Sequence, residues 1–331
     1  MRAPDFWQRP GHVLTPLLWP ASLAWTAAAR LRRAFARPYR APVPVICVGN
    51  LVAGGAGKTP VTLAIAKLAQ ARRIQVHLLS RGYGGRIAGP HRVDPAKDTA
   101  EDVGDEPLLL AARAPTWIAA DRAAGARAAV AAGAQLIVMD DGFQNPGLAK
   151  TLSLIVVDGG QGFGNGRVIP AGPLREPVAD GLRRAQAVVL IGEDTVAIDT
   201  GALPVLRAQI APGPDAERYR GERVAAFAGI GRPAKFYDTL RRLGANLVAT
   251  RDFADHYRYK PEDIMAMVDH ARARDAVLIT TAKDAVRLPP GALNMVHVLP
   301  VELAWHDPAA LDRILAPALR PKTPSPKTPT R

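Results

Sequence analysis

The chain has too few cysteines to be held together by disulfides. Cys47 is the only cysteine among 331 residues, so no intramolecular disulfide can form and a reducing compartment is expected. It lies within an apolar run, where its expected role is that of a small core side chain. The chain also shows no internal repeat. These absences exclude a disulfide scaffold and a repeat array.

The chain also lacks an uninterrupted apolar run suited to crossing a bilayer. Residues 13–29 carry no charge, but they number seventeen and include Pro16 and Pro20, whereas about 20 apolar residues are needed to span a membrane. Basic residues follow this stretch, the reverse of their order in a signal peptide; they are Arg30, Arg32, Arg33 and Arg37. Composition leaves two interpretations open, an interfacial helix at a membrane surface or a helix packed on the core.

Acidic residues are too few to balance the basic ones. The chain has 30 Asp and Glu against 43 Lys and Arg, a formal net charge of +13, which favours phosphate-rich partners such as anionic lipid, nucleotide or nucleic acid. No nucleic-acid recognition motif accompanies the charge, so a nucleic-acid-binding module rests on net charge alone. The length and an apolar content of 48% indicate a folded protein with a large core, arranged in two domains.

A phosphate-binding loop is the most informative feature that is present. Residues 43–49 form an apolar, strand-like run, and a glycine-rich turn ending in Gly57, Lys58 and Thr59 leads into a helical pattern. Such a turn surrounds phosphate oxygens with backbone N–H groups, while its lysine reaches the β- and γ-phosphates and its hydroxyl binds Mg²⁺. The usual motif has glycine at the position of Val52. The expected ATP-binding residues are Gly54, Gly55, Ala56, Gly57, Lys58 and Thr59.

A second apolar run, residues 136–139, ends in Asp140 and Asp141. The carboxyl end of a strand in a parallel sheet adjoins the phosphate loop, where ligands bind. We therefore assign Asp141 as the carboxylate that holds Mg²⁺ with Thr59. Taken alone, Asp-Asp-Gly is equally typical of an ordinary turn.

Strand-like runs alternate with helical patterns along the remaining chain. The expected strands are residues 74–79, 116–119, 136–139, 152–157, 187–191, 205–210, 224–227, 246–249, 276–280 and 296–299. This alternation predicts an α/β protein with a P-loop-type, mostly parallel sheet flanked by helices, a second smaller α/β domain and an N-terminal amphipathic helix. The expected boundaries are 1–40 for the N-terminal segment, 41–203 for the P-loop core, 204–303 for a linker and the second domain, and 304–331 for a C-terminal helix and a disordered, proline-rich tail at 321–329.

Seven motifs, in order along the chain, carry a family resemblance. They are Gly49-Asn50-Leu51, the Gly-Gly-Ala-Gly-Lys-Thr-Pro loop, Ser80-Arg81-Gly82-Tyr83-Gly84, Val103-Gly104-Asp105-Glu106-Pro107, Asp140-Asp141-Gly142-Phe143-Gln144, Pro170-Ala171-Gly172-Pro173-Leu174-Arg175-Glu176 and Phe253-Ala254-Asp255-His256-Tyr257. Together they resemble the tetraacyldisaccharide 4'-kinases, the lipid A 4'-kinases of Gram-negative bacteria. The resemblance covers nearly the whole chain, from about residue 10 to residue 305.

The resemblance implies transfer of the γ-phosphate of ATP to the 4'-hydroxyl of tetraacyldisaccharide 1-phosphate, a lipid A precursor, giving lipid IVA. It implies ATP and Mg²⁺ as cofactors, an acylated disaccharide 1-phosphate as substrate, and peripheral binding to anionic lipid at the cytoplasmic face of the bacterial inner membrane. We expect a monomer and no nucleic-acid partner. Because acyl chains do not leave a bilayer readily, the resemblance favours the interfacial interpretation of residues 13–29.

The resemblance also assigns catalytic roles. Asp105 and His256 match an aspartate–histidine pair that accepts the proton of the acceptor hydroxyl, and an imidazole beside a carboxylate can orient it and adjust its proton affinity. By their residue types alone, Asp105 would be a helix N-cap and His256 a surface histidine. The two fall in different expected domains, so domain closure would assemble the site. The remaining assignments are Lys58 and Arg175 at the phosphates and Thr59, Asp141 and Glu106 at Mg²⁺.

The chain departs from the family pattern at two positions, and one rival function shares its phosphate loop. The family commonly has histidine at Asn145 and glutamate at Ala282, and neither change removes a residue assigned above. The rival is a P-loop ATPase that switches conformation to position a partner. Such proteins often carry a lysine near the start of the loop, where this chain has Ala53, and they have no need of an Asp105–His256 pair.

Overall fold

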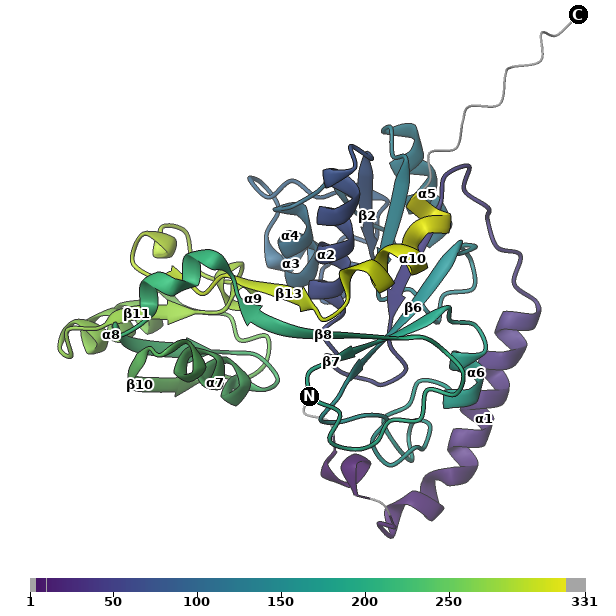
Figure 1. Ribbon diagram of the computed structural model, residues 1–331, viewed down its shortest axis with the longest axis horizontal. Coiled ribbons are helices and arrows are strands. Elements are labelled where there is room, and N and C mark those ends of the chain that lie inside the picture. The colour runs from purple at the N-terminus through teal and green to yellow at the C-terminus, as the bar shows by residue number, and fades with distance from the viewer. Residues whose placement is uncertain (1–3, 10, 320–331) are drawn as a thin grey trace, which may run out of the picture.

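A large and a small β-sheet form the frame of the protein. The structure, a computed structural model, describes residues 4–9 and 11–319. Within these residues there is a nine-stranded, mostly parallel sheet and a four-stranded parallel sheet, each flanked by helices (Figure 1). The predicted fold class is thereby confirmed. The tail expected at 321–329 lies outside the described residues.

The large sheet has the order β13-β8-β7-β6-β1-β5-β2-β4-β3. Its strands are β1 (Val45–Gly49), β2 (Val76–Ser80), β3 (His91–Arg92), β4 (Thr116–Ile118), β5 (Leu136–Asp140), β6 (Leu152–Asp158), β7 (Ala187–Ile191), β8 (Val205–Pro212) and β13 (Val301–Trp305). Neighbours are parallel except at the two edges, where β13 pairs with β8 and β3 pairs with β4 antiparallel. The central position of β1, between β5 and β6, brings the ends of all three strands to one edge.

The apolar run of β1 is continuous because both faces of the large sheet are covered. Ile46 and Val48 pack on one face with α2 (Lys58–Ala71) and α10 (Pro308–Leu319). Val45 and Cys47 pack on the other face with α5 (Arg122–Ala131). Full burial of a Val or Ile side chain is worth about 1.5–3 kcal/mol, so this strand anchors the loop that follows it.

The small sheet has the order β10-β9-β11-β12, with strands β9 (Arg223–Ala228), β10 (Asn246–Asp252), β11 (Val277–Thr280) and β12 (His297–Val298). Helix α7 (Pro233–Leu243) packs on one face through Phe236 and Leu240, and α8 (Pro261–Arg272) packs on the other through Ile264 and Met267. The shorter elements are η1 (Asp5–Gln8), α3 (Ala100–Val103), α4 (Asp105–Ala111), α6 (Val178–Leu182), η2 (Pro214–Tyr219), α9 (Ala282–Ala285) and η3 (Ala292–Asn294).

An antiparallel ribbon of β8 and β13 joins the two sheets (Figure 1). Both strands belong to the large sheet, although the sequence analysis grouped residues 205–210 with the second domain. It also gave no strand at β13 or β3. The side chains of β13 are exposed or half-buried, and β3 has two residues, so neither shows an apolar run. From β13 the chain returns to α10, which packs on the large sheet.

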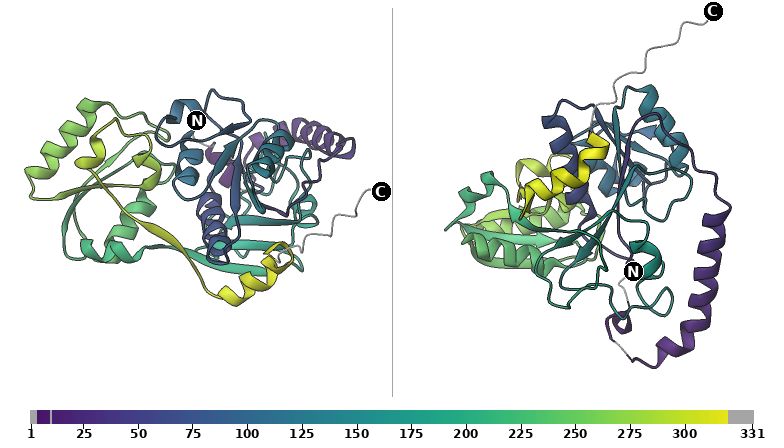
Figure 2. Two further views of the ribbon diagram at one scale, coloured as in Figure 1. Left: turned by 90° about the horizontal axis from the view of Figure 1, so that it is seen from above. Right: turned by 45° about the vertical axis from the view of Figure 1, so that its right-hand side comes forward.

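The N-terminal helix α1 (Leu14–Ala34) lies along the outside of the large sheet, on the side away from the small sheet (Figures 1 and 2). Its one buried residue is Ser22, whose hydroxyl donates to the Val168 carbonyl at 2.7 Å. Trp25 Nε1 donates to the Arg175 carbonyl at 3.1 Å, which ties the helix to the site described below. Of the helices in the described part of the chain, none is long and apolar enough to cross a membrane.

A close approach at Gly49 yields a stability prediction. A Cβ at Gly49 would lie 2.4 Å from the Cβ of Phe143, a buried residue of the loop after β5. We expect Gly49→Ala to lower the free energy of unfolding by about 1–3 kcal/mol through overpacking. Urea denaturation measures it, with Gly213→Ala as the matched control, because a Cβ there meets only ordinary contacts at 3.5 Å or more. Equal stability of the two variants would contradict the steric argument.

Candidate functional site

The phosphate loop connects β1 to α2. Lys58 and Thr59 are the first residues of α2, so its free backbone N–H groups lie beside them. Gly57 has φ +84°, and a Cβ there would lie 2.5 Å from Ile191 Cδ1. Glycine is therefore required at that turn both by its conformation and by the close approach of β7. The loop lines a cavity of about 3550 Å³ between the two sheets.

All residues assigned from the sequence line this one cavity. They are Gly54, Gly55, Ala56, Gly57, Lys58, Thr59, Asp105, Glu106, Asp141, Arg175 and His256. The cavity is bounded by the phosphate loop, the start of α4, the end of β5 and the loops of the small sheet. The tertiary structure therefore brings together motifs that are about 200 residues apart in the chain.

The two acids at the end of β5 have different partners. Asp140 is fully buried and accepts hydrogen bonds from Thr62 at 3.1 Å and, more weakly, from Thr59 at 3.4 Å. Asp141 has a positive φ of 51° and accepts a bidentate pair from Arg175 at 2.7 and 3.1 Å. Lys58 Nζ lies 3.6 Å from the Asp141 carboxylate. The sequence analysis chose Asp141 for the metal and missed the contact of Asp140 with Thr59.

Their electrostatic environments also differ. Burial raises the pKa of Asp140 to about 7, and the charge of Glu106 adds to this effect. Burial acts in the same direction on Asp141, but the positive charges of Lys58 and Arg175 outweigh it and hold the pKa of Asp141 below its usual range. The pKa of Asp140 therefore lies near neutral pH, while Asp141 stays ionised.

Asp105 and His256 meet across the boundary between the sheets. Asp105 begins α4 beside the large sheet, and His256 lies on the loop after β10 of the small sheet. His256 Nδ1 lies 2.7 Å from Asp105 Oδ2. His256 adopts φ 60°, and Gly104, before Asp105, adopts φ +89°, with Tyr83 O only 2.4 Å from where a Cβ would stand. Both loops therefore hold uncommon backbone conformations where the two side chains meet.

Arg287 and Asp284, which the sequence analysis did not assign, extend the contacts of the Asp105–His256 pair. Arg287 Nε lies 3.3 Å from Asp105 Oδ2, and its guanidinium also donates to Asp284 at 2.8 Å. Burial opposes ionisation of Asp105, but the hydrogen bond from His256 and the charge of Arg287 hold its pKa below the usual range. Asp284 lies two residues after Ala282, one of the two departures from the family pattern, so this segment was the available signal.

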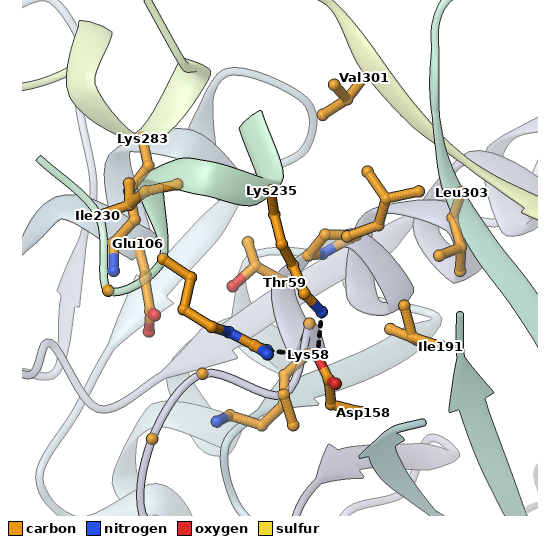
Figure 3. Close-up of a pocket in the computed structure, with 18 of the residues that line it drawn as sticks. Lys58, Thr59, Glu106, Asp158, Ile191, Ile230, Lys235, Lys283, Val301 and Leu303 are labelled. Carbon is orange, nitrogen blue, oxygen red and sulfur yellow. Dashed lines mark hydrogen bonds and ion pairs between the residues drawn. The ribbon is translucent and has the colours of Figure 1, made fainter. Parts of the chain in front are cut away.

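A second group of charges joins the two parts of the protein at the cavity. Asp158, at the end of β6, accepts a hydrogen bond from Lys235 of α7 at 2.7 Å and another from Arg232. Figure 3 shows the Lys235–Asp158 contact beside Lys58 and Thr59. Burial opposes ionisation of Asp158, but the two hydrogen bonds outweigh it and lower its pKa. The small sheet therefore also contributes cations at the phosphate loop.

The donors present suit Mg²⁺ in the manner of a P-loop protein. Among the described residues no group of three or more His, Cys, Asp or Glu could hold a metal ion. Mg²⁺ at nucleotide sites usually takes one or two protein oxygens and completes its shell with phosphates and water. Thr59 Oγ1 and the Asp140 carboxylate supply such oxygens beside Lys58, with Asp141 and Glu106 on the same cavity.

Comparisons with known proteins agree with this geometry. A family model described as LpxK, tetraacyldisaccharide-1-P 4'-kinase, matches residues 14–320. The chain is 59% identical over 330 residues to the tetraacyldisaccharide 4'-kinase of Rhodospirillum centenum, covering 97% of this chain and 98% of that protein. It is 51% identical over 332 residues to that of Rhodospirillum rubrum, covering 98% of this chain and 100% of that protein.

A solved structure shares the fold. It is that of the "apo" form of LpxK from Aquifex aeolicus in complex with ATP, and it superposes with a TM-score of 0.75 at 26% identity. The match covers 93% of this chain and all of that one. The likeness therefore includes both sheets.

The raised pKa of Asp140 predicts a pH-dependent gain from Asp140→Asn. The unfolded carboxyl ionises near pH 3.8 and the folded one near 7, so the folded state retains a proton that the unfolded chain has lost, and this group subtracts stability as the pH rises through that window. We expect the substitution to increase the free energy of unfolding by about 2 kcal/mol more at pH 8 than at pH 5.

Denaturation at the two pH values, without magnesium or nucleotide, measures that difference. The matched control is Asp269→Asn on the exposed surface of α8. This substitution should change the free energy of unfolding equally at pH 5 and pH 8. A gain for Asp140→Asn that is independent of pH would show that Asp140 ionises as an ordinary carboxyl.

Proposed function

Because the chain belongs to the tetraacyldisaccharide-1-P 4'-kinase family and has the tetraacyldisaccharide 4'-kinase activity of lipid A biosynthesis, we propose that its catalytic centre is the cavity between the phosphate loop and the Asp105–His256 pair. The observation that carries this assignment is the 2.7 Å contact of those two side chains on a cavity lined by Lys58 and Thr59. Family membership also decides against the partner-switching ATPase.

Binding of ATP follows from the loop. The N–H groups of residues 54–59 and the Lys58 ammonium face the β- and γ-phosphates, as in other P-loop enzymes. Thr59 and Asp140 would hold Mg²⁺, with Asp141 and Glu106 as further carboxylates on the same cavity. The ion, when bound, neutralises charge that develops on the phosphates. Arg175, held by its two bonds to Asp141, would add a guanidinium at the phosphates.

The acceptor proton passes to the Asp105–His256 pair. Both His256 Nδ1 and Arg287 Nε contact Oδ2 of Asp105, which leaves Oδ1 to accept the proton of the 4'-hydroxyl. The hydroxyl oxygen then attacks the γ-phosphorus, the bond to the bridging oxygen breaks, and ADP leaves with that oxygen. His256, held 2.7 Å from the carboxylate, orients it for this step.

Association with a membrane surface belongs to the same proposal. Along α1 and its flanks, Val13, Leu17, Leu31 and Phe35 expose 60–78% of their surface. Such side chains gain free energy when buried at a lipid interface, and neighbouring arginines gain from anionic headgroups. A helix lying on the cytoplasmic face of the inner membrane would present acylated disaccharide to the cavity, which Trp25 and Arg32 of α1 also line.

The dyad assignment predicts a selective loss of turnover. With ATP and detergent-dispersed tetraacyldisaccharide 1-phosphate, Asp105→Asn and His256→Gln should each lower kcat by about 10²–10⁴, the range for loss of a general base. ATP affinity should change little. Matched controls are Asp269→Asn and His270→Gln, both on the exposed side of α8. Full turnover in both dyad variants would refute the assignment, and ATP hydrolysis without labelled lipid would refute the acceptor.

The membrane assignment predicts weaker vesicle binding when α1 loses apolar surface. Leu17→Glu and Leu31→Glu should each reduce cosedimentation with anionic vesicles by roughly tenfold, because each removes about 1.5–3 kcal/mol of apolar burial. Met265→Glu, at an exposed position on α8, is the control. Binding that is unchanged in both α1 variants would place the membrane contact elsewhere.

A further inference from the structure

A smaller cavity of about 300 Å³ lies beside the catalytic one, at the C-terminal end of α1. The loop after β5 forms one wall, with Gln144, Asn145 and Lys150, and the end of α1 contributes Arg33. Arg33 and Gln144 line both cavities, so the two are contiguous. None of the assigned catalytic residues lines the smaller one.

Positive charge exceeds negative charge in this cavity. Arg33, Lys150 and Arg184 line it, and the buried carboxylate of Glu176 accepts from Arg33 at 2.9 Å and from Arg184. Lys150 Nζ donates to the Asn145 carbonyl, and across residues 4–9 and 11–319 no carboxylate lies within ion-pair distance of it. Arg33 and Arg184 thus share one carboxylate, and Lys150 has none at ion-pair distance among the described residues.

Arg33 and Lys150 have N–H donors that make no hydrogen bond to the described protein residues. Arg184 is held on the scaffold, because it donates to the Asp180 carbonyl at 3.1 Å and stacks 4.4 Å over the Phe143 ring. Arg33 makes one side-chain bond and Lys150 one, out of five and three N–H donors. Burial lowers the pKa of Lys150, and the charges of Arg184 and Arg33 lower it further. A bound anion would relieve this repulsion.

A chain of side-chain contacts connects the smaller cavity to the phosphate loop. Lys58 lies beside Asp141, Asp141 pairs with Arg175, and Arg175 Nη1 lies 3.4 Å from Gln144 Oε1. Gln144 Nε2 in turn donates to Glu176, the partner of Arg33, at 3.1 Å. Arg33 and Gln144 line both cavities, so space is continuous between the phosphate loop and the smaller cavity along this row.

We infer that Arg33 and Lys150 bind the phosphate at the 1-position of the disaccharide while its 4'-hydroxyl lies at the catalytic pair. This rests on the proposed function, which places the acceptor hydroxyl beside Asp105. The substrate class has a hydroxyl at one end of a rigid two-sugar headgroup and a phosphomonoester at the other, and paired Arg and Lys donors are the usual receptors for that group. The phosphate of a bilayer lipid has the same chemistry, and the experiment separates the two sources.

The test compares tetraacyldisaccharide 1-phosphate with the same lipid carrying a free hydroxyl at the 1-position. Wild-type protein should lose roughly tenfold in kcat/KM when the phosphate is removed, as expected for one charge-assisted contact. Lys150→Met and Arg33→Gln should each lower kcat/KM on the phosphorylated lipid by about as much, mainly by raising KM. On the lipid without the 1-phosphate, their kcat/KM should stay close to that of wild type. Lys150→Arg should retain the preference, and Lys97→Met, at an exposed lysine, should match wild type.

The outcomes separate the explanations. Equal losses on both lipids in Lys150→Met and Arg33→Gln would show a structural role and overturn the inference. Loss of binding to phosphatidylglycerol vesicles with the substrate preference intact would assign the cavity to bilayer lipid and overturn it as well. If wild-type protein phosphorylated neither lipid, the proposed function itself would fail.

Discussion

The contact of Asp105 with His256 and Arg287 determines how the two halves of the protein must lie for the site to exist. The Asp105 side chain is only 10% exposed, and a carboxylate buried without partners is strongly disfavoured. His256 and the cation Arg287 both come from the other half, so the ionised form of Asp105 is stable only when the halves are together. The polar network beneath it, with Asp284 at its centre, holds Arg287 in place. Ionisation of Asp105 and placement of the two halves are therefore one requirement.

The boundary between the halves has a consistent polarity. The large sheet and its loops supply the carboxylates of Glu101, Asp105 and Asp158. The small sheet and its loops supply their cations, which are Arg258, Arg287, Arg232 and Lys235. A triphosphate at the phosphate loop adds negative charge to the side that is already negative, so it strengthens attraction for Arg232 and Lys235. Arg32 and Arg33 of α1 line the same cavity, so part of the excess of basic residues that gives the net charge of +13 is positioned there.

Local patterns were sufficient to predict most of the architecture. The apolar strand before Gly57, the helix after it and most of the later strands were visible because a sheet covered on both faces requires continuous apolar runs. The ribbon of β8 and β13 was harder to predict, because β13 is half-exposed and pairs with a strand about 90 residues earlier in the chain. The residue-by-residue catalytic assignments came from motif resemblance, because nothing local distinguishes Asp105 from a helix cap. Arg287 has no local signature, and only its three-dimensional contacts reveal it.

The alternation of side chains along β5 distinguishes the roles of Asp140 and Asp141. Successive side chains of a strand point to opposite faces. Val138 packs with α2 residues on one face, and Met139 packs on the other. Asp140 has the parity of Val138 and therefore faces α2, where it meets Thr62 and Thr59, whereas Asp141, with its positive φ, turns toward Arg175. Because the helix after a phosphate loop covers a known face of its strand, counting residues from the apolar run would have indicated the acid that reaches the loop threonine.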